Sequence, residues 1–269
     1  MKLLYYLAAI GKPNLDQKLE FLVHNLNYIH SNINQTFDIN INSYELDTTI
    51  IEWITQKIAN LHFIDNFFIH KKKGILTELF LTNPYNKQMH NYDHILFILD
   101  DVKIINMDIQ EMIRIKTIHK IKLLSPKIIG AWWPWMFSMK NITIHNFLEI
   151  FLILATPADL EAYFNINTVD NKWMWGVDFL FGYYKMRTGI INTYVAKHMF
   201  APRMGDDTLD AQKRLEQYLH KYTPYSDLDN IKQTTLPISE EIGYVDGKWQ
   251  RKVVRHCSWT ARPPFINIT

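Results

Sequence analysis

The sequence has one cysteine, no large excess of positive or negative charge, and no long hydrophobic run. Each of these features excludes a class of protein. Its one cysteine, Cys257, has no partner for an intrachain disulfide and excludes a cysteine-rich zinc site, which suits a reducing compartment. The 29 basic and 27 acidic residues nearly cancel, whereas non-specific nucleic-acid binding needs a strongly basic face. No apolar stretch approaches the roughly 20 residues of a membrane-spanning helix. We therefore expect a soluble, cytoplasmic protein with no nucleic-acid partner and no transmembrane segment.

Residues 1–11 combine one lysine with an apolar run and superficially resemble a signal peptide. We interpret them as a strand, because an apolar run of about eight residues is short for a signal core and a helix follows it. That helix is predicted by apolar residues at helical spacing after Asn14, its expected N-cap. The apolar stripe consists of Leu15, Leu19, Leu22, Val23, Leu26 and Ile29.

Strand and helix patterns alternate along the first hundred residues. Residues 37–41 and 62–69 show strand patterns, residues 50–58 show helical spacing, and a further helix is expected from Gly74. Such alternation predicts an α/β fold of the Rossmann type, because helices that connect parallel strands cover the faces of their sheet. With 269 residues and 48% hydrophobic content, the chain is long enough for a large packed core.

Two adjacent carboxylates follow a predicted buried strand. The apolar run from His94 to Leu99 leads directly to Asp100 and Asp101. Because open α/β sheets bind ligands beyond the carboxyl ends of their strands, this pair indicates a site for a hard divalent metal such as Mg²⁺ or Mn²⁺. The alternative is a solvated turn, since aspartate is a preferred turn residue.

Two further segments complete a recognisable order along the chain. One is the aromatic segment from Lys172 to Leu180, which contains Trp175, Gly176 and Asp178, and the other runs from Gly189 to His198. An apolar strand that ends in acids, an aromatic Trp-Gly-x-Asp segment and a Gly-Ile strand that ends in histidine together resemble nucleotide-sugar glycosyltransferases of the GT-A fold. More narrowly, the chain resembles glycosyltransferases predicted in large DNA viruses, which implies the host cytoplasm.

The resemblance covers roughly residues 2–205. It implies a GT-A-like domain over residues 1–205, with a mixed, mostly parallel central sheet flanked by helices. Residues 206–269 carry a charged helix and otherwise little periodicity, so we expect them to form a helix and an irregular extension packed on the same domain.

The resemblance also implies roles for single residues. Asp101 stands where the metal-binding aspartate of the family motif ends its strand, and Asp100 stands at the position that faces the ribose or diphosphate of the donor. The sequence departs from the family pattern at Leu99, because an acidic residue commonly opens the motif. His198 matches a late histidine that completes the metal shell, and Asp178 matches the acid that serves as catalytic base in inverting members.

The donor nucleotide is expected at the end of the first strand. Ala8, Ala9 and Ile10 leave that strand where a parallel sheet opens its crevice, and the two alanines allow close approach. Lys73 lies just before the helix expected from Gly74, where its charge and the helix N-terminus suit a diphosphate. The alternative for this lysine is a solvated turn.

Aromatic residues supply the candidate acceptor site. Trp132, Trp133 and Trp175 could stack on the apolar faces of a sugar, although plain packing in the core is the alternative. Asp178 could likewise simply cap a helix that starts at Phe179.

The sequence therefore predicts a metal-dependent, inverting glycosyltransferase with Mn²⁺ or Mg²⁺ as cofactor. Its partners would be a UDP-linked sugar donor and a glycan or glycoprotein acceptor. Two alternatives stay open: a nucleotidyltransferase or phosphohydrolase that uses the Asp100–Asp101 pair, and a non-catalytic sugar-binding module. A two-metal enzyme would need further acidic ligands, and the nearby Asp93 is expected at the wrong end of its strand.

Overall fold

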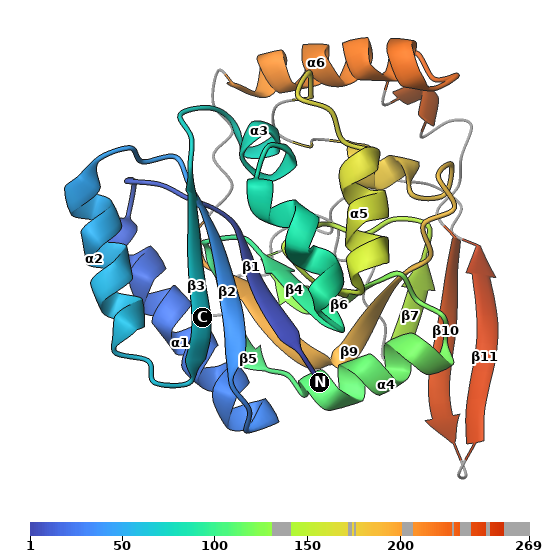
Figure 1. Cartoon of the computed structure of the whole chain (residues 1–269). Helices are drawn as coiled ribbons and strands as arrows, with labels where there is room; N and C mark the ends of the chain where they lie inside the picture. The colour runs from blue at the N-terminus through green and yellow to red at the C-terminus, as the bar shows by residue number, and fades with distance from the viewer. Residues whose placement is uncertain are drawn as a thin grey trace.

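One mixed sheet runs through the protein, and helices cover both of its faces (Figure 1). The computed structural model describes residues 1–130, 141–171, 174, 176–200, 207–227, 229–231, 238–245 and 248–255. Within these residues, eleven strands form the sheet in the order β11-β10-β7-β9-β6-β8-β4-β1-β2-β3, and β5 pairs with β9 outside that path.

The N-terminal part is the alternating α/β unit that the sequence predicts. Its four strands β3-β2-β1-β4 pair in parallel, so their carboxyl ends share one edge of the sheet. The elements in chain order are β1 (Leu3–Ile10), α1 (Leu15–Ile33), β2 (Phe37–Ser43), α2 (Thr48–Ala59), β3 (Ile64–Lys71), α3 (Leu76–Leu81), the 3-10 helix η1 (Pro84–Asn91) and β4 (His94–Ile98). Asn14 occupies the N-cap position of α1, as expected. Its backbone is in the left-handed region, however, and its side chain makes no capping hydrogen bond, so the expected capping role is wrong.

The later strands pair mainly antiparallel, so the expected excess of parallel strands holds only for the N-terminal part. Among them only β6 and β9 run in parallel. The elements are β5 (Val102–Asn106), α4 (Ile109–Ile118), β6 (Leu123–Ile129), β7 (Ile142–His145), β8 (Leu152–Ala155), α5 (Pro157–Asn165), the 3-10 helix η3 (Val177–Leu180), β9 (Thr188–His198), α6 (Asp207–Tyr222), β10 (Ile238–Val245) and β11 (Lys248–Arg255).

The C-terminal extension is more regular than its sequence suggests. It contains the expected charged helix α6, but residues 238–245 and 248–255 form an antiparallel pair of strands where we expected irregular chain. The hairpin strand β10 pairs with β7, so the extension continues the main sheet.

The strand β1 shows how the two cores lie on the sheet. Alternate side chains point to opposite faces of a strand, and here both faces are covered. Tyr5 and Leu7 join the core that contains α1 and α2, whereas Tyr6 and Ala8 join the core that contains α5 and α6. All eight residues of β1 are buried. Ligands therefore cannot reach the faces of the sheet at β1, whereas the carboxyl edge of the parallel strands lies at its end.

Candidate functional site

The Asp pair follows β4, as the sequence predicts, and lies in a tight turn that leads into β5, a strand that was not predicted. After this turn, β5 pairs antiparallel with β9, and Val102 lies opposite His198. This register places His198 beside Asp101: the imidazole Nε2 is 2.8 Å from the carboxylate Oδ2, across 97 positions of sequence. The backbone N–H of Met199 also donates to the carbonyl of Asp101 at 2.8 Å.

An irregularity in β9 precedes this contact. Pro126 of β6 lies opposite Ile191, but Lys127 already lies opposite Val195. Proline has no backbone N–H to donate, and such positions are typical of bulges in a sheet. After this irregularity, Val195, Ala196 and Lys197 pair with both β5 and β6, and His198 pairs with β5.

Packing fixes the imidazole of His198. Its ring centroid is 4.7 Å from that of Phe151, and its side chain is only 8% exposed. Gly130 packs against the same residue with φ of 92°, and a methyl group there would lie 3.1 Å from the carbonyl oxygen of His198. A side chain at position 130 would therefore strain the backbone and crowd the histidine.

Asp101 and His198 are close enough that they could hold one divalent ion together in place of their mutual hydrogen bond. Asp101 Oδ1 and His198 Nδ1 are buried and have no hydrogen-bond partner among the described residues. Neighbouring ligands of an octahedral Mg²⁺ lie about 3 Å apart, since each is about 2.1 Å from the ion. The 2.8 Å separation of the pair is close to that spacing. The described residues contain no group of three or more His, Cys, Asp or Glu side chains placed to hold a metal, so water and substrate would complete the shell.

Asp100 faces away from this pair, toward the start of α1. Its carboxylate lies 2.7 Å from the Lys18 ammonium group, and the two side chains are 17% and 13% exposed. Burial raises the pKa of Asp100 to about 6, although Lys18 and the backbone N–H of Gly11 favour the ionised form. Lys18 is not among the site residues predicted from the sequence. The available signal was its position in the first turns of α1, directly after β1, which brings it to the carboxyl edge of the sheet.

The remaining donor-site candidates surround this corner. Ala8 and Ile10 are fully buried in β1, on opposite faces, and Ala9 is 5% exposed. Lys73 is exposed in the segment before α3. Contact of these residues with a nucleotide stays a prediction.

Asp178 is the second residue of η3, two positions after Gly176. Gly176 has φ of 77°, and a methyl group there would clash with Leu215, so the turn requires glycine. Burial raises the pKa of Asp178 to about 7, although the backbone N–H groups of Asp178 and Phe179 lower it. These N–H bonds also fit the capping alternative.

The segment around Asp178 packs against the chain that leads into the strand β8. That strand starts opposite Ile98, at the end of β4, and runs antiparallel to it. Phe147, shortly before β8, packs against Phe179 with ring centroids 4.6 Å apart. No hydrogen bond or ion pair joins Asp178 to Asp101 or His198 among the described residues. The candidate acceptor residues Trp132, Trp133 and Trp175 lie outside the described residues.

Solved structures share the architecture. GalNAc-T7, solved with UDP, GalNAc and Mn²⁺, aligns with a TM-score of 0.56 at 7% identity, over 82% of this chain and 47% of its own. S. aureus TarS aligns with a TM-score of 0.52 at 12% identity, over 86% of this chain and 41% of its own. Both are glycosyltransferases of the GT-A fold. The chain has a GT-A-like fold. Residues 1–349 of TarS with UDP give a TM-score of 0.50 at 13% identity, over 86% and 68% of the two chains.

The likeness lies in the fold alone. The chain spans less than half the length of TarS and of GalNAc-T7. No protein-family model and no curated protein sequence matches it. Among the helices that the structure describes, none combines the length and the apolar character needed to cross a membrane.

Proposed function

We propose that the protein is a metal-dependent glycosyltransferase that moves a sugar from a UDP-linked donor to a glycan hydroxyl with inversion at the anomeric carbon. The observation that carries this proposal is the Asp101–His198 pair, which the fold assembles at the carboxyl edge of the sheet. The fold neighbours that hold UDP or Mn²⁺ support the donor and the metal. The narrower likeness to viral glycosyltransferases stays a prediction.

Asp101 and His198 would hold Mn²⁺ or Mg²⁺, which as a Lewis acid stabilises the charge that develops on the leaving diphosphate. Asp100 would accept a hydrogen bond from the ribose beside its ion pair with Lys18. Lys18 would face the diphosphate from the same corner. Lys73 would approach that group from the start of α3.

Asp178 would act as the general base. Its carboxylate takes the proton of the acceptor hydroxyl while the acceptor oxygen bonds to the anomeric carbon. The bond from that carbon to the diphosphate oxygen breaks, and the nucleoside diphosphate leaves with the bonding electrons. A base whose pKa is about 7 is well matched to this proton transfer near neutral pH.

The two alternatives have less support. Two-metal phosphoryl chemistry needs further acidic ligands. Asp93 lies at the amino end of β4, where its carboxylate accepts a hydrogen bond from the Lys2 backbone at 2.7 Å. A sugar-binding module would have no need of a buried Asp–His pair at the sheet edge.

The test is release of nucleotide from a panel of UDP- and GDP-sugars in the presence of Mn²⁺, with and without candidate glycan acceptors. We expect acceptor-dependent release of UDP by the natural protein and none by Asp101→Asn. The variant Glu52→Gln, which removes an exposed carboxylate of α2, serves as the matched control and should keep full activity. Turnover of no sugar nucleotide, or equal turnover by Asp101→Asn, would contradict the proposal.

A further inference from the structure

A cavity of about 410 Å³ lies between the end of α4 and the β10–β11 hairpin. Arg187, which lines it, directly precedes β9, whereas His198 is the last residue of that strand. Because β9 has 11 residues and a strand rises about 3.3 Å per residue, the two sites lie roughly 30 Å apart. The cavity is therefore separate from the proposed catalytic edge. Its polar lining consists of His119, Lys120, Arg187, Gln250 and Arg251.

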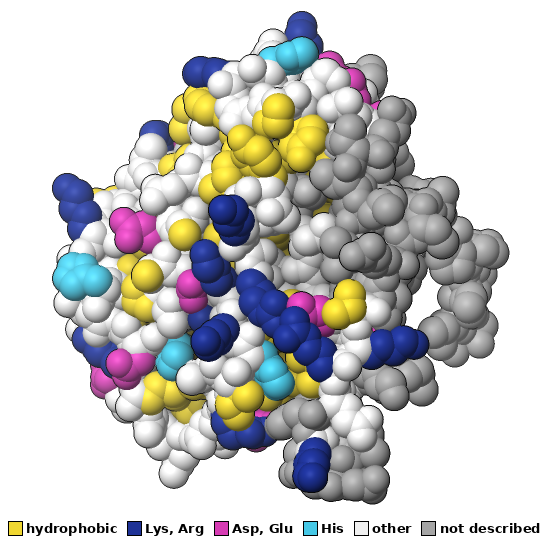
Figure 2. Space-filling model, turned by 90° about the vertical axis from the view of Figure 1, so that its right-hand side faces the viewer, with side chains coloured by type: hydrophobic (Ala, Val, Ile, Leu, Met, Phe, Trp, Pro, Cys, Tyr) yellow, Lys and Arg dark blue, Asp and Glu magenta, His cyan; other side chains and the backbone are white. Residues whose placement is uncertain are grey.

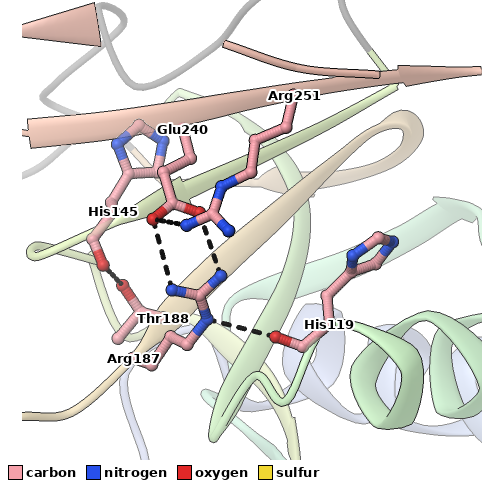
Figure 3. A network of polar contacts seen from close by, with 6 residues as sticks. All are labelled: His119, His145, Arg187, Thr188, Glu240 and Arg251. Carbon is pink, nitrogen blue, oxygen red and sulfur yellow. Dashed lines mark hydrogen bonds and ion pairs between the residues drawn. The ribbon is translucent and has the colours of Figure 1, made fainter. Parts of the chain in front are cut away.

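Two guanidinium groups are held side by side at this cavity (Figure 3). Arg187 Nη2 lies 2.9 Å from Glu240 Oε2, and Arg251 Nη2 donates to Glu240 Oε1. Arg187 Nε also donates to the carbonyl of His119 at 3.1 Å. The carboxylate of Glu240 thus holds two like charges, from the residue before β9 and from β11, and Arg187 also bonds to the end of α4.

Positive charge exceeds negative charge around the cavity. Lys120, Arg187 and Arg251 contribute three positive charges, and Glu240 contributes one negative charge. The pKa of the His119 imidazole reflects this excess of positive charge. Burial lowers that pKa, Arg187, Arg114 and Arg251 lower it further, and Glu240 opposes them. Figure 2 shows Lys and Arg side chains in a band across this side of the molecule.

Lys120 occupies a backbone position that favours glycine. It follows α4 with φ of 53°, in the left-handed region, where any side chain is disfavoured. Glycine would adopt this conformation without that cost, so the backbone of the turn gives no reason for a lysine at position 120. The lysine side chain adds an ammonium group to the cavity wall.

Arg251 uses only part of the hydrogen-bonding capacity of its guanidinium group. Its side chain is 56% exposed, and in the described part of the chain only Nη2 has a partner. Its Nε and Nη1 donors are therefore available, and the residue lines the cavity. Guanidinium groups recognise phosphate through paired hydrogen bonds, and an ammonium group adds a point charge. We propose that this cavity is an oxyanion site that binds a phosphate group.

The first test is a titration with inorganic phosphate at constant ionic strength, followed by calorimetry and by the unfolding temperature. We expect saturable binding to the natural protein. Arg251→Met and Lys120→Gly should each weaken it by about tenfold or more, because each removes a charged donor. Lys120→Gly relieves the strained backbone, so loss of binding in that variant cannot be attributed to unfolding. Lys57→Met, which removes an exposed charge from α2, is the control and should bind as the natural protein does.

A second arm identifies the source of the phosphate. Vesicles of phosphatidylcholine, with and without phosphatidylglycerol, are sedimented with the protein. Binding that requires phosphatidylglycerol, and that inorganic phosphate and Arg251→Met both abolish, assigns the group to a lipid headgroup. Phosphate binding without vesicle binding assigns it to a soluble phosphate compound. No saturable phosphate binding, or equal binding by all four proteins, would overturn the proposal and leave the glycosyltransferase assignment untouched.

Discussion

Lys18 and Asp100 form a largely buried ion pair, with 2.7 Å between ammonium and carboxylate, that joins the first helix to the end of β4. The pair lies beside the segment after β1, whose Gly11 N–H also favours the ionised carboxylate. A buried carboxylate without a cation is costly, so Lys18 determines whether Asp100 can remain charged.

Replacement of the lysine should therefore destabilise the protein in a pH-dependent way. Lys18→Met is expected to lower the free energy of unfolding by about 3 kcal/mol at pH about 8, because it leaves a buried charge unpaired. The pKa of Asp100 in the folded protein is raised to about 6, so its carboxyl is mostly neutral at lower pH. Urea unfolding at two pH values, about 5 and about 8, should show the smaller loss at the lower pH.

The double variant Lys18→Met/Asp100→Asn provides the control. It carries no charge at either position and should recover most of the stability lost at high pH. A loss in Lys18→Met that is the same at both pH values would show that packing of the lysine stem, rather than the charge of Asp100, is responsible.

The sequence predicts the N-terminal half of the fold well, because its signals are local. The apolar stripe of α1 and the strand before Asp100 are both visible in short windows and were both found. The antiparallel strands β5 and β10 were missed. Their stability depends on partners far along the chain: β5 pairs with β9, and β10 pairs with β7.

The residues of the candidate site likewise fall into those visible in the local sequence and those that depend on distant partners. A strand that ends in two acids marks Asp100 and Asp101 from the sequence alone. Nothing in the local pattern joins His198 to them, and only the resemblance to GT-A enzymes suggested it. Lys18 was not predicted, because its partner Asp100 is 82 positions away on another element. Its position at the start of α1 indicates the sheet edge but not the partner.

The Asp101–His198 pair should be measurable as a metal site without any activity assay. Titration calorimetry with Mn²⁺ is expected to show binding to the natural protein that weakens by at least about tenfold in Asp101→Asn and in His198→Gln. Donor binding should weaken in parallel, and removal of metal with EDTA should reproduce that loss. Glu52→Gln is again the control. Unchanged Mn²⁺ affinity in either site variant would remove that residue from the metal shell.

Replacement of Asp178 should slow transfer to the acceptor without weakening donor binding. We expect Asp178→Asn to lower the transfer rate by about 10² to 10⁴, because a positioned base contributes a factor of that size. Binding of UDP should change little. Since the base works in its deprotonated form and its pKa is about 7, transfer by the natural protein should rise with pH and level off above neutral pH. Full activity of the variant would reassign the base.

The same carboxyl should also limit the stability of the protein at neutral and alkaline pH. Its pKa rises from 3.8 when unfolded to about 7 when folded, so the folded state binds more protons between these values. Stability tied to the protonated group is therefore fully present below about pH 4 and is lost as the pH rises through about 7. Asparagine is neutral at every pH and its side-chain oxygen can still accept the backbone N–H bonds at the start of η3. Thermal unfolding across this range should accordingly show Asp178→Asn close to the natural protein near pH 4 and more stable than it near pH 8. A constant difference between the two proteins would mean that Asp178 is accommodated as a charged cap, which would weaken its assignment as the base.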